Sequence, residues 1–237
     1  MTATLPRRTV SEFLGTGFLV AAVVGSGIMG ERLAAGNVAI ALLANTVATG
    51  AALVALILTF GPISGAHFNP VVTLADAIEH GLTWTDAAWY IAAQCLGGVG
   101  GTITAHLMFR LPLVSISRHG RGGPAQNFGE SVATFGLLAV IWGCSRRRSE
   151  MVPFAVGAYI TAAYWFTAST AFANPAVTIA RCLSDTFAGI RPGDVPGFIA
   201  AQFLGGLTAT VLFRWLVPRL RVQAENILVP HGSERIR

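Results

Sequence analysis

Two octapeptides of this chain are nearly identical, and one lies in each half. Residues 69–76 read NPVVTLAD and residues 174–181 read NPAVTIAR. Asparagine is a good helix N-cap and proline fits the first position of a helix, so each box predicts a helix start. Two further pairs of segments recur in the same order: EFLGTGFLV from Glu12 with ESVATFGLL from Glu130, and IAAQCLGG at 91–98 with IAAQFLGG at 199–206. Chance explains three ordered matches poorly, so the chain is interpreted as an internal repeat.

Long apolar stretches surround both boxes. Of the 237 residues, 53% are hydrophobic and only 11% are charged, whereas about 25% are charged in typical soluble domains. A membrane-spanning helix needs about 20 mostly apolar residues. Six stretches are long enough: 11–30, 38–60, 86–109, 129–145, 151–171 and 197–217. The two stretches that begin with Asn-Pro, 69–79 and 174–185, are too short to cross a membrane and are predicted to be half-helices.

Each half of the chain contains three predicted spans. Because three is odd, the second half must lie upside down relative to the first, which is the inverted-repeat plan of transport proteins. The two half-helices then enter from opposite sides, and their N-termini meet near the middle of the bilayer. Polar backbone at that depth must be covered by protein or line a cavity. Two positive helix ends and two asparagine amides favour neutral solutes with acceptor oxygens and repel cations.

The basic residues predict the orientation and the division of the chain. Arginines precede the first span, follow the fourth and occur in the tail, at positions 7, 8, 146–148, 219, 221, 235 and 237. The positive-inside rule places these segments in the cytoplasm, although the loop with Arg110, Arg118 and Arg121 would then face outward. We expect a cytoplasmic N-terminus at 1–9, one channel domain at 10–217 with repeats at 10–109 and 129–217, and a polar cytoplasmic tail at 218–237. The short charge clusters between apolar runs do not favour nucleic acid binding.

The segments SGAHFNPVVT (64–73) and FANPAVT (172–178), with the other repeated segments, resemble the paired boxes of the major intrinsic proteins, the aquaporins and glycerol facilitators. The resemblance covers residues 10–217. It implies an all-α membrane protein, an aquaporin-like right-handed bundle of six transmembrane helices and two re-entrant half-helices, which forms a homotetramer and conducts solutes passively across the cell inner membrane. It also implies that Glu12 and Glu130 brace the half-helices. The central constriction that it implies consists of Asn69, Pro70, Val71, Asn174, Pro175 and Ala176.

The boxes also depart from the family pattern. Val71 replaces the usual alanine of the first box, and Val177 stands where most members carry the arginine of an outer aromatic/arginine filter. Counting from the boxes, the corresponding filter consists of Thr49, Ala162, Ala171 and Val177, with Tyr164 in place of Ala162 if a two-residue gap is allowed. This set predicts a wide, weakly polar mouth without an aromatic wall or a guanidinium.

Two residues near the boxes are predicted to line the vestibules. Arg181 lies four residues after Val177 on one helix face, about 6 Å nearer the outer mouth, where it would attract oxygen-rich or anionic solutes. Alternatively, Arg181 packs against a loop carbonyl or pairs with Asp185. His67 is expected to form hydrogen bonds in the inner vestibule, with a proton relay as the alternative.

The resemblance also bears on the solute. Glycerol facilitators usually carry aspartate where this chain has Thr178, whereas bacterial members from arsenic-resistance operons share the second box without arginine. That likeness implies passage of arsenite as As(OH)3, and also of methylated or pentavalent arsenicals, polyols and water. The alternatives are a generic glycerol, urea and water facilitator and a proton-coupled transporter that uses the intramembrane carboxylates. No spacing typical of a metal site or a catalytic triad is present, so we expect no cofactor, no metal and no enzyme activity.

Overall fold

The computed structural model describes residues 3–145 and 148–216, and these segments are helical without strands. Six long helices are connected by loops in the order α1, α2, α4, α5, α6 and α8. Their bounds are Leu5–Leu33, Val38–Ser64, Trp84–Met108, Pro124–Ser145, Val152–Phe166 and Val195–Leu216. Two short helices, α3 (Pro70–Ile78) and α7 (Pro175–Arg181), begin at the Asn-Pro boxes. Two 3₁₀ turns, η1 (Ser149–Met151) and η2 (Pro192–Asp194), precede α6 and α8.

Six long and two short helices were predicted, but several boundaries differ. The first long helix begins at Leu5 rather than at residue 11, and α5 begins at Pro124 rather than at residue 129. The second half-helix ends at Arg181 rather than at residue 185, and α6 ends at Phe166 rather than at residue 171. Residues 167–174 instead form the loop that leads into the second box. By length and apolarity, the helices able to cross a membrane within the described segments are α1, α2, α5 and the stretch Pro192–Leu216. Helices of this length and apolarity are typical of a membrane protein.

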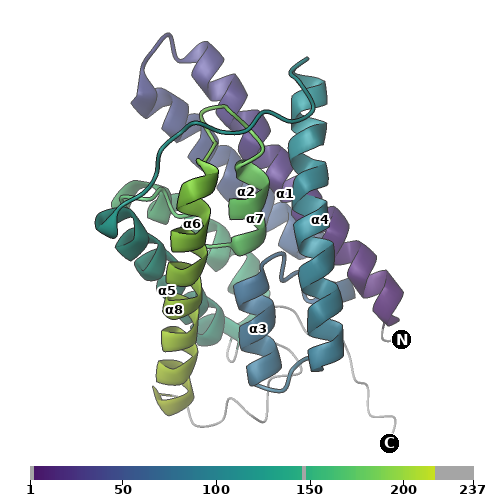
Figure 1. Cartoon of the computed structure of the whole chain (residues 1–237). Coiled ribbons are helices and arrows are strands. Elements are labelled where there is room, and N and C mark those ends of the chain that lie inside the picture. Colours follow the sequence, from purple (N-terminus) through teal and green to yellow (C-terminus); the bar gives the residue numbers. More distant parts are fainter. Residues whose placement is uncertain (1–2, 146–147, 217–237) are drawn as a thin grey trace, which may run out of the picture.

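The two half-helices lie end to end in the middle of the bundle (Figure 1). The long helices around them pair in the same way in each repeat. In the first repeat α1 packs against α2 and α4, and in the second α5 packs against α6 and α8. The repeated sequence therefore builds two similar three-helix units, and α3 and α7 fill the space between them.

Glycines allow two of these helix pairs to approach closely. A Cβ atom on Gly97 of α4 would overlap the carbonyl oxygen of Phe13 in α1. At the matching step of the second repeat, a Cβ atom on Gly205 of α8 would overlap the carbonyl oxygen of Ser131 in α5. Small residues let membrane helices pack backbone to backbone. The repeated LGG segments therefore fix the α1–α4 and α5–α8 crossings.

The distribution of polarity is that of a membrane protein. Large apolar side chains are exposed on the outer surface, such as Leu33, Trp89 and Trp215, while Glu12 and Glu130 are fully buried. Intramembrane carboxylates of this kind face the interior of a bundle. The arginines at 146 and 147 and the tail at 218–237, on which the predicted orientation partly rests, lie outside the described residues.

Candidate functional site

The loops that precede the two half-helices share an unusual backbone. Ala66 and Phe68 before the first box, and Ala171 and Ala173 before the second, all have φ between 47° and 50°. Such left-handed backbone is uncommon for residues other than glycine and costs on the order of 1–3 kcal/mol at each position. Strain of this kind persists only where surrounding contacts enforce it. Because the strain occurs at matching positions of both loops, surrounding contacts must hold both loops in the same defined shape.

The two box asparagines tie these loops together. Asn69 caps α3 by accepting a hydrogen bond from the backbone N–H of Val71, and its Nδ2 donates to the carbonyl of Ala173 at 2.7 Å. Asn174 caps α7 in the same way, and its Nδ2 donates to the carbonyl of Phe68 at 2.7 Å. These bonds fix the orientation of both amides. Each amide nitrogen carries two N–H groups, so one on each asparagine is left for a solute.

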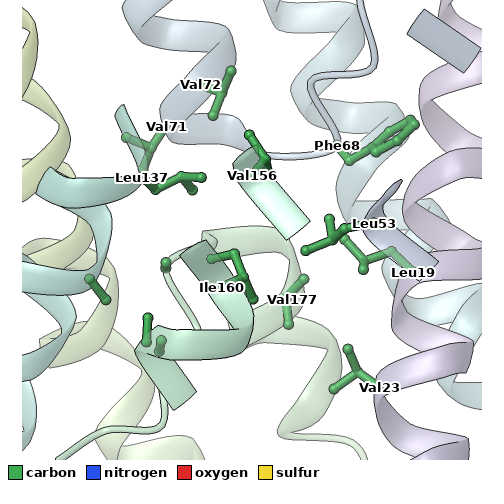
Figure 2. Close-up of a cluster of buried hydrophobic side chains, with 14 of the residues drawn as sticks. Leu19, Val23, Leu53, Phe68, Val71, Val72, Leu137, Val156, Ile160 and Val177 are labelled. Carbon is green, nitrogen blue, oxygen red and sulfur yellow. The ribbon is translucent and has the colours of Figure 1, made fainter. Parts of the chain in front are cut away.

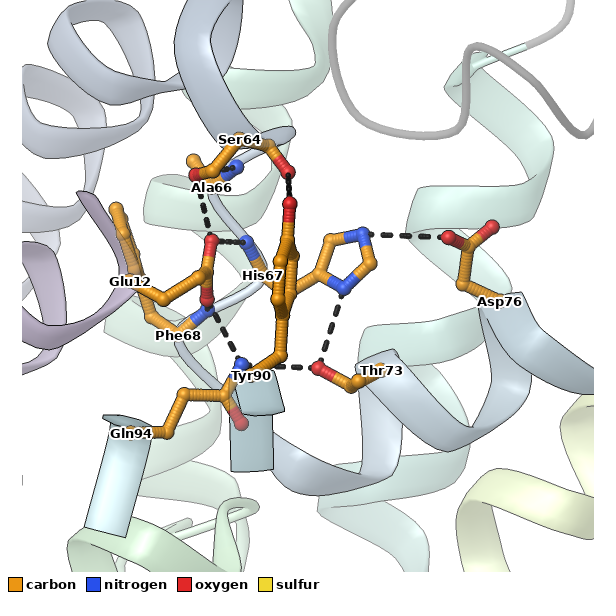
Figure 3. A network of polar contacts seen from close by, with 9 residues as sticks. All are labelled: Glu12, Ser64, Ala66, His67, Phe68, Thr73, Asp76, Tyr90 and Gln94. Carbon is orange, nitrogen blue, oxygen red and sulfur yellow. Dashed lines mark hydrogen bonds and ion pairs between the residues drawn. The ribbon is translucent and has the colours of Figure 1, made fainter. Parts of the chain in front are cut away.

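Glu12 and Glu130 accept hydrogen bonds from the strained loops. The carboxylate of Glu12 accepts from the backbone N–H groups of His67 at 3.0 Å and Phe68 at 2.7 Å, and from Gln94 at 2.8 Å (Figure 3). In the second repeat the carboxylate of Glu130 accepts from the N–H groups of Phe172 at 2.9 Å and Ala173 at 2.8 Å, and from Gln202 at 2.6 Å. Both sets of bonds have the geometry of a brace that satisfies polar backbone in the middle of the bundle.

A cavity runs between the two repeats, past both asparagines. Its walls are mainly apolar, and Figure 2 shows Leu19, Val23, Leu53, Leu137, Val156, Ile160 and Val177 among the side chains that surround it. Its polar lining residues are Thr49, His67, Asn69, Tyr164, Asn174 and Arg181. Such walls offer few hydrogen bonds, so a solute in the cavity depends on these few polar groups.

Three of the four residues predicted for the outer filter lie on the cavity wall. Thr49, Ala171 and Val177 are buried and line the cavity. Ala162 does not, because it lies on the exposed face of α6. Tyr164 lies two residues further along α6, on the buried face, and its hydroxyl is 3.3 Å from Oγ1 of Thr49. The prediction of Ala162 is therefore wrong, and Tyr164 occupies that part of the wall.

Arg181 combines two of the alternatives that its position left open. Its side chain is fully buried and lines the cavity, and its Nε donates to the backbone carbonyl of Ala188 in the loop after α7. Asp185 instead accepts a hydrogen bond from the backbone N–H of Arg118. With Tyr164, this arginine also corrects the prediction of a mouth that lacks both an aromatic ring and a guanidinium.

His67 lines the cavity at the level of the first box. Its Nδ1 is 3.1 Å from Oγ1 of Thr73, and its Nε2 is 3.5 Å from a carboxylate oxygen of Asp76 (Figure 3). The ring also packs edge-on against Tyr90, with 5.5 Å between the ring centroids. These contacts hold the imidazole on the wall of the cavity.

The residues of the two boxes have different tasks. Of the six predicted for the central constriction, only Asn69 and Asn174 line the cavity. Pro70 and Pro175 occupy the first positions of α3 and α7. The side chains of Val71 and Ala176 are buried elsewhere, and Val71 packs so closely on Gly206 of α8 that this glycine has no room for a Cβ atom.

Sequence reasoning did not identify the individual residues of the apolar wall, and it treated Arg121 only as a charge that bears on orientation. Arg121 is held in the loop between α4 and α5 by four hydrogen bonds, and burial lowers the pKa of its guanidinium. Its position in a loop carried no signal for these contacts.

The described residues contain no cluster of histidine, cysteine, aspartate or glutamate that could hold a metal ion. The arrangement can bind and pass a small solute, but it contains no activated nucleophile.

Comparison with known proteins agrees with this geometry. The sequence model of the major intrinsic protein family matches residues 1–170 and 147–235. Among curated proteins, the chain is 57% identical over 217 residues to the aquaglyceroporin AqpS of Rhizobium meliloti (strain 1021), which covers 92% of this chain and 93% of the relative. It is 29% identical to the aquaporin NIP2-3 of Zea mays, over 98% of this chain and 75% of the relative. Among solved structures, the aquaglyceroporin from Plasmodium falciparum has a similar fold, with a TM-score of 0.72 at 19% identity, covering 92% of this chain and all of that one.

Proposed function

Because this chain belongs to the major intrinsic protein family, we propose that its cavity selects small uncharged solutes larger than water, with arsenite, As(OH)3, as the first candidate. The protein is a passive membrane channel and not an enzyme. The proposal concerns the selectivity and the physiological setting of this channel. It places one channel domain at 10–217 in the bacterial inner membrane, as a homotetramer with both termini in the cytoplasm.

Val177 is the observation that carries this proposal. The residue directly after the second box is apolar, buried and part of the cavity wall. An arginine at this position would extend a long side chain with five N–H donors into the same space. Valine leaves that space open and offers no hydrogen bond. We call the apolar part of the cavity wall at Val177 the collar. The collar therefore accepts solutes that carry apolar groups or exceed water in size.

The polar groups on either side of this collar suit a solute rich in hydroxyl groups. Asn69 and Asn174 each keep one amide N–H for the path, and the hydroxyls of Thr49 and Tyr164 lie on the wall. As(OH)3 is uncharged at neutral pH and resembles a small polyol in shape. Methylated arsenicals add apolar methyl groups that fit the apolar wall at Val177. The 57% identity to an aquaglyceroporin, AqpS, supports a solute channel of this kind.

A generic glycerol, urea and water facilitator is the second candidate, because the same donors serve any small polyol. A proton-coupled transporter is disfavoured by the geometry of the two carboxylates. Glu12 and Glu130 are fully buried, do not line the cavity and are occupied by backbone N–H groups of the box loops. A proton carrier must reach the path of the solute.

Light scattering on proteoliposomes tests the proposal. Wild type, Val177→Arg and the apolar control Val177→Leu are compared for water, glycerol, As(OH)3 and a pentavalent methylarsenical. We expect wild type and Val177→Leu to pass the larger solutes and Val177→Arg to lose them while it still passes water. If wild type passes only water, or if Val177→Arg passes all four solutes as wild type does, the proposal is refuted.

A further inference from the structure

Two buried arginines at the outer end of the cavity lie against the same aromatic ring. The guanidinium of Arg181 is 3.4 Å from the ring centroid of Phe172, and that of Arg121 is 5.1 Å from it. Three consecutive carbonyls of the loop after α7 accept from them, those of Phe187 and Gly189 from Arg121 and that of Ala188 from Arg181. Buried charge is costly unless it is paired, so a pair of neighbouring cations requires an explanation.

Arg121 is explained by its contacts. Each nitrogen of its guanidinium group donates to the protein: Nε to Gly189 at 2.8 Å, Nη2 to Phe187 at 3.2 Å and Nη1 to the hydroxyl of Thr170 at 3.2 Å. Arg121 does not line the cavity. Its role is to hold the outer loops in place.

Arg181 differs from Arg121 in both respects. It lines the cavity, and its Nη1 is buried without a hydrogen-bond partner among the described residues. A buried donor on a charged group is expensive to leave unsatisfied. The bond from Nε to Ala188 and the ring of Phe172 nevertheless hold the guanidinium at the cavity wall. The hydroxyl of Tyr164 lies beside the same guanidinium, so two polar groups from α6 and α7 meet there.

We propose that Arg181 is the specificity-determining residue of the outer mouth, where its Nη1 donates to an acceptor oxygen of the entering solute and its charge excludes cations. This inference rests on the proposed function, because it requires that the cavity conducts solutes. The class of ligand is a small neutral molecule that presents hydroxyl or oxyacid oxygens. Tyr164 provides a second hydrogen-bonding group, which can donate or accept.

The position of Arg181 separates two tasks along the path. It follows Val177 by one helical turn in α7, which is about 6 Å along the helix axis. An incoming solute therefore first replaces a hydrogen bond to water with one to Arg181, and then passes the apolar collar at Val177. An arginine at position 177 would perform recognition and narrowing at one level. Because one helical turn separates the two residues, Arg181 can bind an oxygen of the solute without narrowing the cavity at Val177.

The test compares solutes of similar size that differ in one hydroxyl group. Wild type, Arg181→Gln, Arg181→Lys and the control Arg121→Lys are reconstituted in proteoliposomes, and permeabilities to glycerol, 1,2-propanediol, methylammonium and water are measured. In Arg181→Gln we expect the ratio of glycerol to propanediol permeability to fall about fivefold, the equivalent of one net hydrogen bond. We also expect wild type to exclude methylammonium and Arg181→Gln to admit it at least about tenfold faster, because the buried charge is lost.

The lysine variants separate charge from hydrogen-bond geometry. Arg181→Lys keeps the charge but not the planar fork, so methylammonium should stay excluded while the solute ratio falls. Arg121→Lys should lower thermal stability and leave both selectivity readouts as in wild type. The inference is overturned if Arg181→Gln, with normal water permeability, shows the wild-type ratio and still excludes methylammonium. If Arg181→Gln does not fold, an unchanged ratio in Arg181→Lys overturns it.

The two proposals fail in different ways. If wild type passes only water, the proposed function is refuted. The methylammonium assay then still tests the cation barrier: entry through Arg181→Gln supports it, and continued exclusion overturns it. A wild type that passes glycerol and arsenite supports the proposed function whatever the variants of Arg181 do.

Discussion

Replacing Glu130 with glutamine tests whether the strained loop before α7 depends on its brace. One carboxylate oxygen of Glu130 accepts from the backbone N–H of Phe172 at 2.9 Å. The other accepts from the N–H of Ala173 at 2.8 Å and from Gln202 at 2.6 Å. A backbone N–H cannot become an acceptor. Whichever way the glutamine amide turns, its NH2 group therefore faces a backbone N–H that has lost its partner.

The magnitude follows from counting the bonds that are lost. The better orientation keeps Ala173 and Gln202 bonded and leaves only the N–H of Phe172 unsatisfied, which costs about 1–3 kcal/mol. The two remaining bonds are weakened as well, because they no longer point to an ionised acceptor. We expect a total loss of about 2–4 kcal/mol. Glu130→Ala removes the acceptor of all three donors and should lower the free energy of unfolding more than Glu130→Gln does.

Thermal unfolding of the purified protein in detergent measures this loss. For a chain of this size about 1 kcal/mol corresponds to a shift of roughly 2–4 °C, so Glu130→Gln should lower the melting temperature by roughly 4–16 °C. Glu150→Gln is the matched control, because Glu150 is exposed in the turn before α6. Melting of Glu130→Gln within 1–2 °C of wild type would show that the brace does not hold the loop and would refute this reasoning.

Three further predictions concern the pore wall and the helix packing. Tyr164→Ala should lower the ratio of glycerol to 1,2-propanediol permeability in proteoliposomes, because the hydroxyl of Tyr164 lies on the cavity wall. Ala162→Leu should leave this ratio unchanged, because Ala162 lies on the exposed face of α6; equal effects would contradict the assignment. Gly205→Ala should lower stability by about 1–3 kcal/mol, because its methyl group overlaps a backbone carbonyl of α5. The control Gly100→Ala has room, with 3.8 Å to the nearest atom, and should melt no lower than wild type. Arg214→Gln leaves its partner Glu79, which is fully buried directly after α3, without an ion pair. The variant should lower the free energy of unfolding by about 3 kcal/mol in a thermal melt, and Arg214→Lys should recover part of this loss.

The sequence predicted the half-helices and their meeting point because local chemistry controls both. Asn-Pro can begin a helix in any context, and two copies in an odd-numbered repeat must enter from opposite sides. Both asparagines are indeed found at the cavity. The boundary at Arg181 was less predictable. Residues 182–185 contain no glycine or proline that would end a helix. Hydrogen bonds from the loop between α4 and α5 replace the helix there, such as that from the backbone N–H of Ser117 to the carbonyl of Cys182.

The face of α6 could not be predicted from its sequence. Residues 152–166 are apolar on all sides, so no periodic pattern tells which side chains point inward. Counting from other family members without a gap selected Ala162, which faces outward. The packing of α6 against α2 decides the matter and places Tyr164 beside Thr49.

The sequence by itself determined the class of this protein, its repeat and its central asparagines, since apolar spans, capping residues and duplicated motifs act locally. Only the tertiary structure decided what surrounds the solute. The left-handed backbone of Phe68 and Ala173 is held by the distant carboxylates of Glu12 and Glu130. Arg181 meets Tyr164 because α6 and α7 converge on one cavity. Selectivity depends on which side chains from different helices share a space of a few ångströms. That arrangement follows from the packing of the whole bundle, and no single segment of the chain encodes it.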